Sequence, residues 1–145
     1  MHKKLLVTAY FVIAALLQTL AGNFPLSFFA FPLNVIVAVI WIYSLWRLYK
    51  EGNKLPLTRF LLSSRTSVLS ILLLIGGSLV IGLFPQLSEA EADSIPGVLA
   101  SLGCYNFMTS WIFIAILFLL LSNLAMVIIH AFYHCVPAKK RFILN

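Results

Sequence analysis

The chain has 145 residues, of which 62% are hydrophobic and 10% are charged, and its formal net charge is +6. A soluble domain carries roughly 25% charged residues, so this composition excludes an ordinary soluble protein and predicts one embedded in a lipid bilayer. A nucleic-acid partner is not expected, because the basic residues cluster at the ends of apolar runs and no soluble domain offers a groove.

Four apolar runs are long enough to cross a bilayer core of about 30 Å, which takes about 20 helical residues. None contains Asp, Glu, Lys, Arg or His, so a helix can satisfy every backbone amide without placing a charge in lipid. The runs are residues 5–21, 28–46, 66–84 and 111–129. We therefore expect an all-α membrane protein with four transmembrane helices in two antiparallel hairpins.

The first run follows Met-His-Lys-Lys, as the apolar part of a secretory signal peptide would. No small-x-small cleavage site follows it, and the second run begins after the short turn GNFPLS, so we interpret the first run as a retained helix. Residues 1–50 are then the first transmembrane hairpin.

The connection at residues 51–65 has the composition of a short helix at the membrane surface. Pro56 suits a helix start, and Leu57, Phe60 and Leu61 make one apolar side. Residues 66–136 are expected to form the second transmembrane hairpin with an acidic outer loop, and residues 137–145 a basic tail. The aromatic residues before the last run, Tyr105, Phe107 and Trp111, are expected to form a belt at the membrane interface.

The charges predict the orientation of the helices. All ten basic residues lie before the first run, between the second and third, or after the fourth, whereas three of the four acids lie in the loop between the third and fourth. The positive-inside rule makes the basic side, with both termini, cytoplasmic. The basic residues are Lys3, Lys4, Arg47, Lys50, Lys54, Arg59, Arg65, Lys139, Lys140 and Arg141.

Small residues in the third run, GGSLVIG, predict a site of close helix packing at Gly77, Ser78 and Gly82. Ser78 and Gly82 are four positions apart and share a face, which would let a second helix approach closely. That helix belongs either to this bundle or to a partner protein. Polar residues within or beside the runs, Gln18, Asn34 and Asn123, are expected to make hydrogen bonds between helices, with a substrate pathway as the alternative.

Two histidines end the fourth run in the sequence IIHAFYHC, residues 128–135. Residues i and i+4 differ by about 40° around a helix, so His130 and His134 share a face and could bind one metal ion. Cys135 lies about 140° from His130, and we expect Pro137 to end the helix, which leaves two ligands and no structural zinc site. The preferred interpretation is an anchor of amphipathic rings at the interface, and a ligand that meets haem from one side is the alternative.

Two segments carry motifs of a known family. Residues 60–86, FLLSSRTSVLSILLLIGGSLVIGLFPQ, have a Phe-Leu-x-Ser-Ser start and a Gly-x-x-Pro-Gln end, and residues 102–124, LGCYNFMTSWIFIAILFLLLSNL, have a Ser-Trp-x-Phe helix start and a later Asn-Leu pair. They resemble the N-terminal membrane part of ResB (Ccs1), the cytochrome c biogenesis proteins of System II, and the preceding hairpin is similar to that of Bacteroidetes-type members. The motif residues are Phe60, Leu61, Ser63, Ser64, Gly82, Pro85, Gln86, Ser110, Trp111, Phe113, Asn123 and Leu124.

The resemblance implies a membrane scaffold for cytochrome c maturation in the bacterial cytoplasmic (inner) membrane. Such proteins work with a CcsA-like partner that moves haem to the outer face, where it is joined to apocytochrome c. Family members usually continue into a helix that opens with a histidine and into a large extracytoplasmic domain, whereas this sequence stops at Asn145. We therefore expect a truncated product or a short relative that keeps only the scaffold, with haem contacted through the partner.

The sequence offers no carboxylate pair, activated nucleophile, phosphate loop or complete zinc motif, so we do not expect an enzyme. The competing hypothesis is a membrane anchor subunit of a respiratory quinol or cytochrome complex, whose partners are other cytochrome subunits. Such an anchor clamps haem between histidines of two helices, but His2, His130 and His134 all lie at the cytoplasmic rim. A small transporter would need polar or broken helices at mid-depth, where only Asn123 qualifies.

Overall fold

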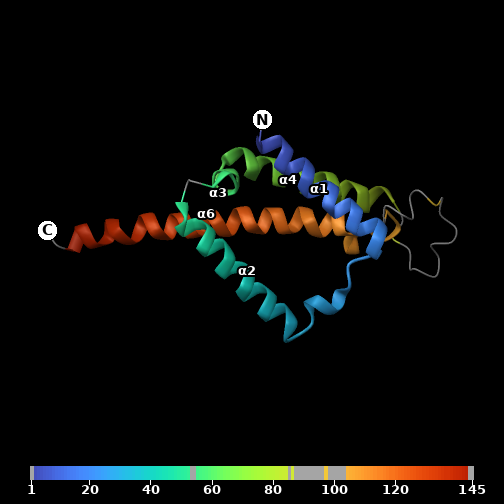
Figure 1. Cartoon of the computed structure of the whole chain (residues 1–145), viewed down its shortest axis with the longest axis horizontal. Coiled ribbons are helices and arrows are strands. Elements are labelled where there is room, and N and C mark those ends of the chain that lie inside the picture. The colour runs from blue at the N-terminus through green and yellow to red at the C-terminus, as the bar shows by residue number, and fades with distance from the viewer. Residues whose placement is uncertain (1, 53–54, 85, 87–96, 98–103, 144–145) are drawn as a thin grey trace.

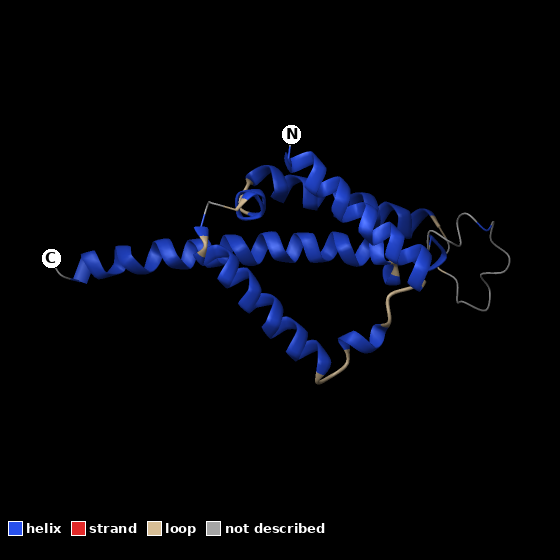
Figure 2. Cartoon of the chain, viewed as in Figure 1, coloured by secondary structure: helices blue, strands red, loops and turns tan. Residues whose placement is uncertain are grey.

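The computed structural model is built of helices and describes residues 2–52, 55–84, 86, 97 and 104–143, with no strand among them (Figure 1, Figure 2). For residues 2–4 and 135–143 it describes the helical backbone alone. The three acids of the expected acidic loop lie outside the described residues. In chain order the elements are α1 (His2–Ala21), the 3-10 helix η1 (Leu26–Phe29), α2 (Leu33–Lys50), α3 (Pro56–Leu61), α4 (Ser64–Leu83), the 3-10 helix η4 (Cys104–Thr109) and α6 (Trp111–Ile143).

The helix α6 is the axis on which the other long helices pack. In Figure 1, α1 and α4 follow one side of its first half, while α2 slants away from it on the opposite side. The helices α4 and α6 run antiparallel in close contact. Along their described lengths, α1 and α2 share no extensive contact, so they are joined in sequence but diverge in space.

Within the described residues, three helices are long and apolar enough to cross a membrane: Leu33–Lys50, Ser64–Leu83 and Trp111–His134, with mean hydropathies of 1.2, 2.2 and 2.9. The apolar part of α1, Leu5–Ala21, is shorter. Large apolar side chains cover the outside of the bundle; Leu20, Phe31 and Leu83, for example, are 83%, 82% and 78% exposed. A surface of this kind suits lipid rather than water.

Two helix boundaries differ from the sequence-based expectation, both near prolines. The helix expected from Phe28 begins at Leu33, because Pro32 lacks an amide donor and its ring suits a position just outside the helix. The expectation that Pro137 ends the last helix is wrong, since α6 continues to Ile143. An apolar helix tolerates a proline where the remaining backbone hydrogen bonds hold the segment together.

The short helix α3 begins at Pro56, as expected, with proline at its first position. Phe60 and Leu61 do not lie on the surface, however. They are buried in the core together with Leu45, Leu119 and Met126, whereas Leu57 remains exposed. The helix α3 is therefore packed into the bundle against α6, α1 and α4, and it brings the connection from α2 to α4 against α6.

Candidate functional site

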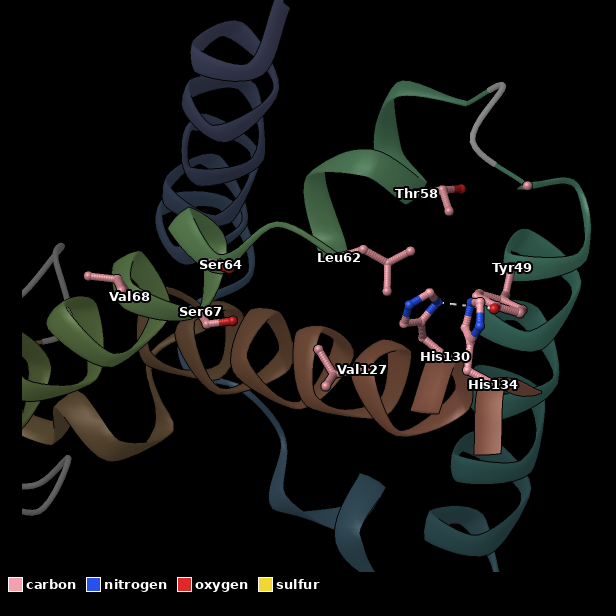
Figure 3. Close-up of a pocket in the computed structure, with 10 residues that line it drawn as sticks. Tyr49, Thr58, Leu62, Ser64, Ser67, Val68, Val127, His130 and His134 are labelled. Carbon is pink, nitrogen blue, oxygen red and sulfur yellow. Dashed lines mark hydrogen bonds between the residues drawn. The ribbon is translucent and has the colours of Figure 1, made fainter. Parts of the chain in front are cut away.

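A partly polar pocket lies at the end where α2 finishes, α4 begins and the second half of α6 passes (Figure 3). Its volume is about 800 Å³. We call it the basic-end pocket, because Arg47, Lys50, Arg59 and Arg65 belong to the helix ends around it. It is lined by Tyr49, Gly52, Thr58, Leu62, Ser64, Ser67, Val68, Val127, His130 and His134.

Both sequence-predicted histidines line this pocket. As expected from their spacing, His130 and His134 lie on one side of α6, with ring centroids 4.4 Å apart (Figure 3). The Nδ1 of His130 is hydrogen-bonded to the phenol oxygen of Tyr49 at 3.1 Å. This bond joins α6 to the last turn of α2, a contact that the sequence did not predict.

Aromatic rings and a lysine surround the histidine pair. The indole Nε1 of Trp46 donates to the Tyr133 oxygen at 2.8 Å, and the Lys50 ammonium lies 3.9 Å from the centre of the Trp46 ring. The Tyr49 and Tyr133 rings are 5.3 Å apart. Amphipathic rings beside a lysine at a helix end are typical of a segment held at the level of lipid headgroups.

The arrangement limits the metal chemistry of the pocket. Within the described residues, no group of three His, Cys, Asp or Glu side chains is close enough to hold a metal ion. The two imidazoles come from the same helix, so they cannot approach opposite faces of one haem. The side chain of Cys135 lies outside the described part of the chain.

Next to the pocket, Asn123 connects three helices, as the sequence led us to expect for interhelical hydrogen bonding. It is only 4% exposed. Its amide donates to the Leu61 carbonyl at the end of α3, and its oxygen accepts a 2.8 Å hydrogen bond from Ser67 of α4. The last carbonyl groups of a helix have no hydrogen-bond partner within that helix, and Leu61 is the last residue of α3. The Asn123 side chain provides a partner for one of these carbonyl groups.

The two other polar residues expected to join helices behave differently. Gln18, also buried, accepts a 2.8 Å hydrogen bond from the amide of Trp111 and thereby connects α1 to the start of α6. Asn34 is exposed, and its side-chain oxygen accepts from the neighbouring Val35 amide. The expectation of an interhelical bond is therefore wrong for Asn34, because α2 slants away from its neighbours at that end.

Of the three small residues predicted to pack closely, Gly77 alone does so against the part of the chain that the structure describes. A Cβ atom at Gly77 would lie 3.2 Å from Cδ2 of Phe113 and 3.4 Å from Cε1 of Phe107. Ser78 and Gly82 are exposed, and a Cβ at Gly82 would meet nothing within 4 Å. Packing against the described part of the bundle is thus wrong for Ser78 and Gly82, because helical residues that follow one another differ by about 100° in direction and Gly77 takes the face toward α6.

Several motif residues fix the other end of the bundle. Ser110 precedes α6, and its hydroxyl accepts a 3.1 Å hydrogen bond from the Phe113 amide. Ser110 is therefore the N-cap residue of α6. The Gln86 side chain accepts from the Phe107 amide at 2.9 Å. Phe107 is buried, and Trp111 packs edge-on against Phe24, so these two rings point into the bundle and the expected belt is not formed by them.

Two apolar cavities lie where α1 and α2 diverge along α6. Their volumes are about 660 and 400 Å³, and both are lined by Tyr10, Ile13, Trp41 and Phe118. The larger cavity reaches Asn34 and Trp111. Cavities of this size and character suit a hydrophobic molecule.

Comparison with known proteins gives no match, whether with family models, curated proteins or solved structures. The two segments that resemble ResB do, however, pack on each other in this fold. Gly77 lies against Phe113, and the Ser67 hydroxyl donates a hydrogen bond to the Asn123 side chain. The Gln86 side chain accepts a hydrogen bond from the Phe107 amide. Of the motif residues, Phe113, Asn123 and Gln86 therefore make packing or hydrogen-bond contacts that hold these segments together, whereas a Cβ at Gly82 would meet nothing within 4 Å.

Proposed function

We propose that this chain spans the bacterial inner membrane four times, with both termini in the cytoplasm; α4 and α6 form a packed hairpin, whereas α1 and α2 are consecutive spans that diverge along α6. The support for α1 as a fourth span is its apolar part, Leu5–Ala21, which extends about 25 Å and lies at the lower end of the length that can cross a bilayer core. The orientation is supported by Arg47, Lys50, Arg59 and Arg65, which all lie where α2 ends and α4 begins.

Reporter fusions test this topology. A reporter placed after Asn145 is expected to be active only in the cytoplasm, and one inserted at Glu91 only outside, because basic flanks are retained inside. A reporter fused before Met1 distinguishes four spans from three. With four spans this reporter is cytoplasmic, and with three spans, when α1 does not cross the membrane, it is external. An external signal from either terminus would contradict the proposal.

We further propose that the chain is a membrane scaffold of cytochrome c maturation that works with a CcsA-like membrane protein. The observation that carries this proposal is the structural role of the family motifs. Gln86 joins the segment after α4 to η4, Ser110 caps the start of α6, and Asn123 joins α6 to α4. Motif residues with such roles fit a framework for a partner rather than a reaction centre.

Native purification tests the partner. The tagged chain, extracted in mild detergent from its own host, is expected to bring down a CcsA-like protein together with haem absorbance. The matched control is the Gln86→Leu, Asn123→Leu double variant, in which the framework is weakened and recovery of the partner should fall. Recovery of dehydrogenase or cytochrome subunits instead would refute the maturation role.

The second candidate function, an anchor subunit of a respiratory quinol or cytochrome complex, is favoured by one observation. The cavity of about 660 Å³ is apolar, and Trp111 on its wall has a buried indole Nε1 that bonds to no described residue. A quinone carbonyl is one acceptor that such a donor would suit. Bound quinone in the native preparation would support this alternative.

A further inference from the structure

The basic-end pocket combines polar donors, basic neighbours and an apolar wall. We propose that it binds one anionic phospholipid, with the phosphate among the polar donors and an acyl chain along the apolar wall. This binding is separate from the proposed function and needs neither a partner protein nor haem. The leaflet that supplies the lipid is the cytoplasmic one, which rests on the proposed orientation of the chain.

Positive charge gathers around the pocket. Three lining residues, each from a different helix, have a basic residue as the next neighbour in the chain: Lys50 follows Tyr49, Arg59 follows Thr58, and Arg65 follows Ser64. The one acid at this end of the described chain is Glu51. Basic pockets between transmembrane helices on the cytoplasmic side bind anionic lipid headgroups. The charge around this pocket therefore suits a phosphate.

The first turn of α4 supplies backbone donors in the pocket wall. Ser64 is the first residue of this 20-residue helix, and it lines the pocket. The N-cap residue, Ser63, makes no side-chain cap hydrogen bond, so its hydroxyl leaves the first amides of α4 to another acceptor. A helix N-terminus favours an anion, because its free amides and the positive end of the helix dipole point at the ligand.

His130 adds a side-chain donor from a different helix. Its Nδ1 lies 3.1 Å from the Tyr49 oxygen. Figure 3 shows its other nitrogen, Nε2, on the side of the ring away from His134 and toward the part of the pocket that Ser67 lines. An anionic oxygen there selects the form in which the Tyr49 hydroxyl donates to Nδ1 and Nε2 carries the hydrogen. Tyr49 thus holds the imidazole in place for donation to a phosphate.

The apolar wall favours a lipid over a free phosphate ion. Val68 of α4 and Val127 of α6 line the pocket and are 58% and 42% exposed. Beside the pocket, Trp46, Lys50 and Tyr133 form the group of rings and ammonium that is typical of the headgroup level. A phosphate bound at this level carries acyl chains that can lie along both valines, toward the membrane core.

Native mass spectrometry of the full chain in mild detergent tests the site. The probes are phosphatidylglycerol and phosphatidylcholine with identical acyl chains at equal concentration, and we expect one phosphatidylglycerol per chain in preference to phosphatidylcholine. The Lys50→Gln, Arg65→Gln double variant should bind phosphatidylglycerol roughly 25-fold more weakly, because each basic residue near an anionic lipid contributes roughly fivefold. His130→Leu should weaken binding roughly tenfold, since it removes a hydrogen bond to a charged group.

The matched control is the Lys139→Gln, Lys140→Gln double variant, which removes the same charge from positions beyond His134, the last lining residue. It should leave the affinity unchanged. Equal losses in the two double variants would refute the pocket and show a general attraction to the basic end.

Two other results would also overturn the site: equal binding of the two lipids, and displacement of phosphatidylglycerol by inorganic phosphate. Binding in detergent does not depend on orientation, so an external reporter signal at this end would change the leaflet and not the site. Lys50, Arg65 and His130 are exposed, so circular dichroism and gel filtration of the variants should match the parent chain and exclude misfolding.

Discussion

Replacing Gly77 with leucine is expected to destabilise the packing of α4 on α6 more than a leucine at any other small residue of the segment GGSLVIG, residues 76–82. A Cβ alone would lie 3.2 Å from Phe113, and leucine adds three more carbons in the same direction. Overpacking of this kind costs about 1–3 kcal/mol and occasionally more. Thermal unfolding in detergent, followed by circular dichroism, measures the loss.

Gly82→Leu is the matched control, because it places the same side chain on the same helix where nothing lies within 4 Å. It should leave stability unchanged or raise it slightly, since glycine inside a helix costs about 1 kcal/mol relative to alanine. Equal losses in the two variants would contradict the packing described for Gly77. A change of oligomeric state in Gly82→Leu alone would instead identify the Ser78 and Gly82 face as a surface for a partner helix.

The long helices could be predicted from sequence because an apolar run free of charge has few alternatives in lipid. Their ends were less certain. Pro32 shifted the start of α2 to Leu33, yet Pro137 did not end α6, because the effect of a proline depends on its place in the helix. The rotation of α4 could not be predicted either, so of the three small residues expected to pack closely, Gly77 alone does so against the described residues.

The candidate site shows the same division between local and long-range information. That His130 and His134 share a face follows from helical spacing, and the structure places their rings together. Their partner Tyr49 is 81 positions away in sequence from His130, and the contact depends on the tilt of α2 against α6. The hydrogen bond from the Trp111 amide to the Gln18 side chain likewise depends on how α1 packs against the start of α6.

Asn123→Leu is expected to be the second strongly destabilising change. The substitution removes the donor to the Leu61 carbonyl and the acceptor for Ser67 in a position that is only 4% exposed. Ser67 is in the first turn of α4 and can turn its hydroxyl to a nearby carbonyl. The Leu61 carbonyl has no such freedom, because it sits at the end of α3.

The size of the loss distinguishes two views of hydrogen bonds in membrane helices. Such bonds average about 0.6 kcal/mol where the unfolded helices find other partners. A buried group left without a partner costs about 1–3 kcal/mol. Since Asn123 joins α6 to both α3 and α4, we expect the larger value in a denaturation series in mixed micelles.

Asn34→Leu is the control, because that asparagine is exposed and, among the described residues, its side chain is hydrogen-bonded to its neighbour Val35. It should change stability little, and an equal effect of the two substitutions would show that the link through Asn123 does not hold the bundle together.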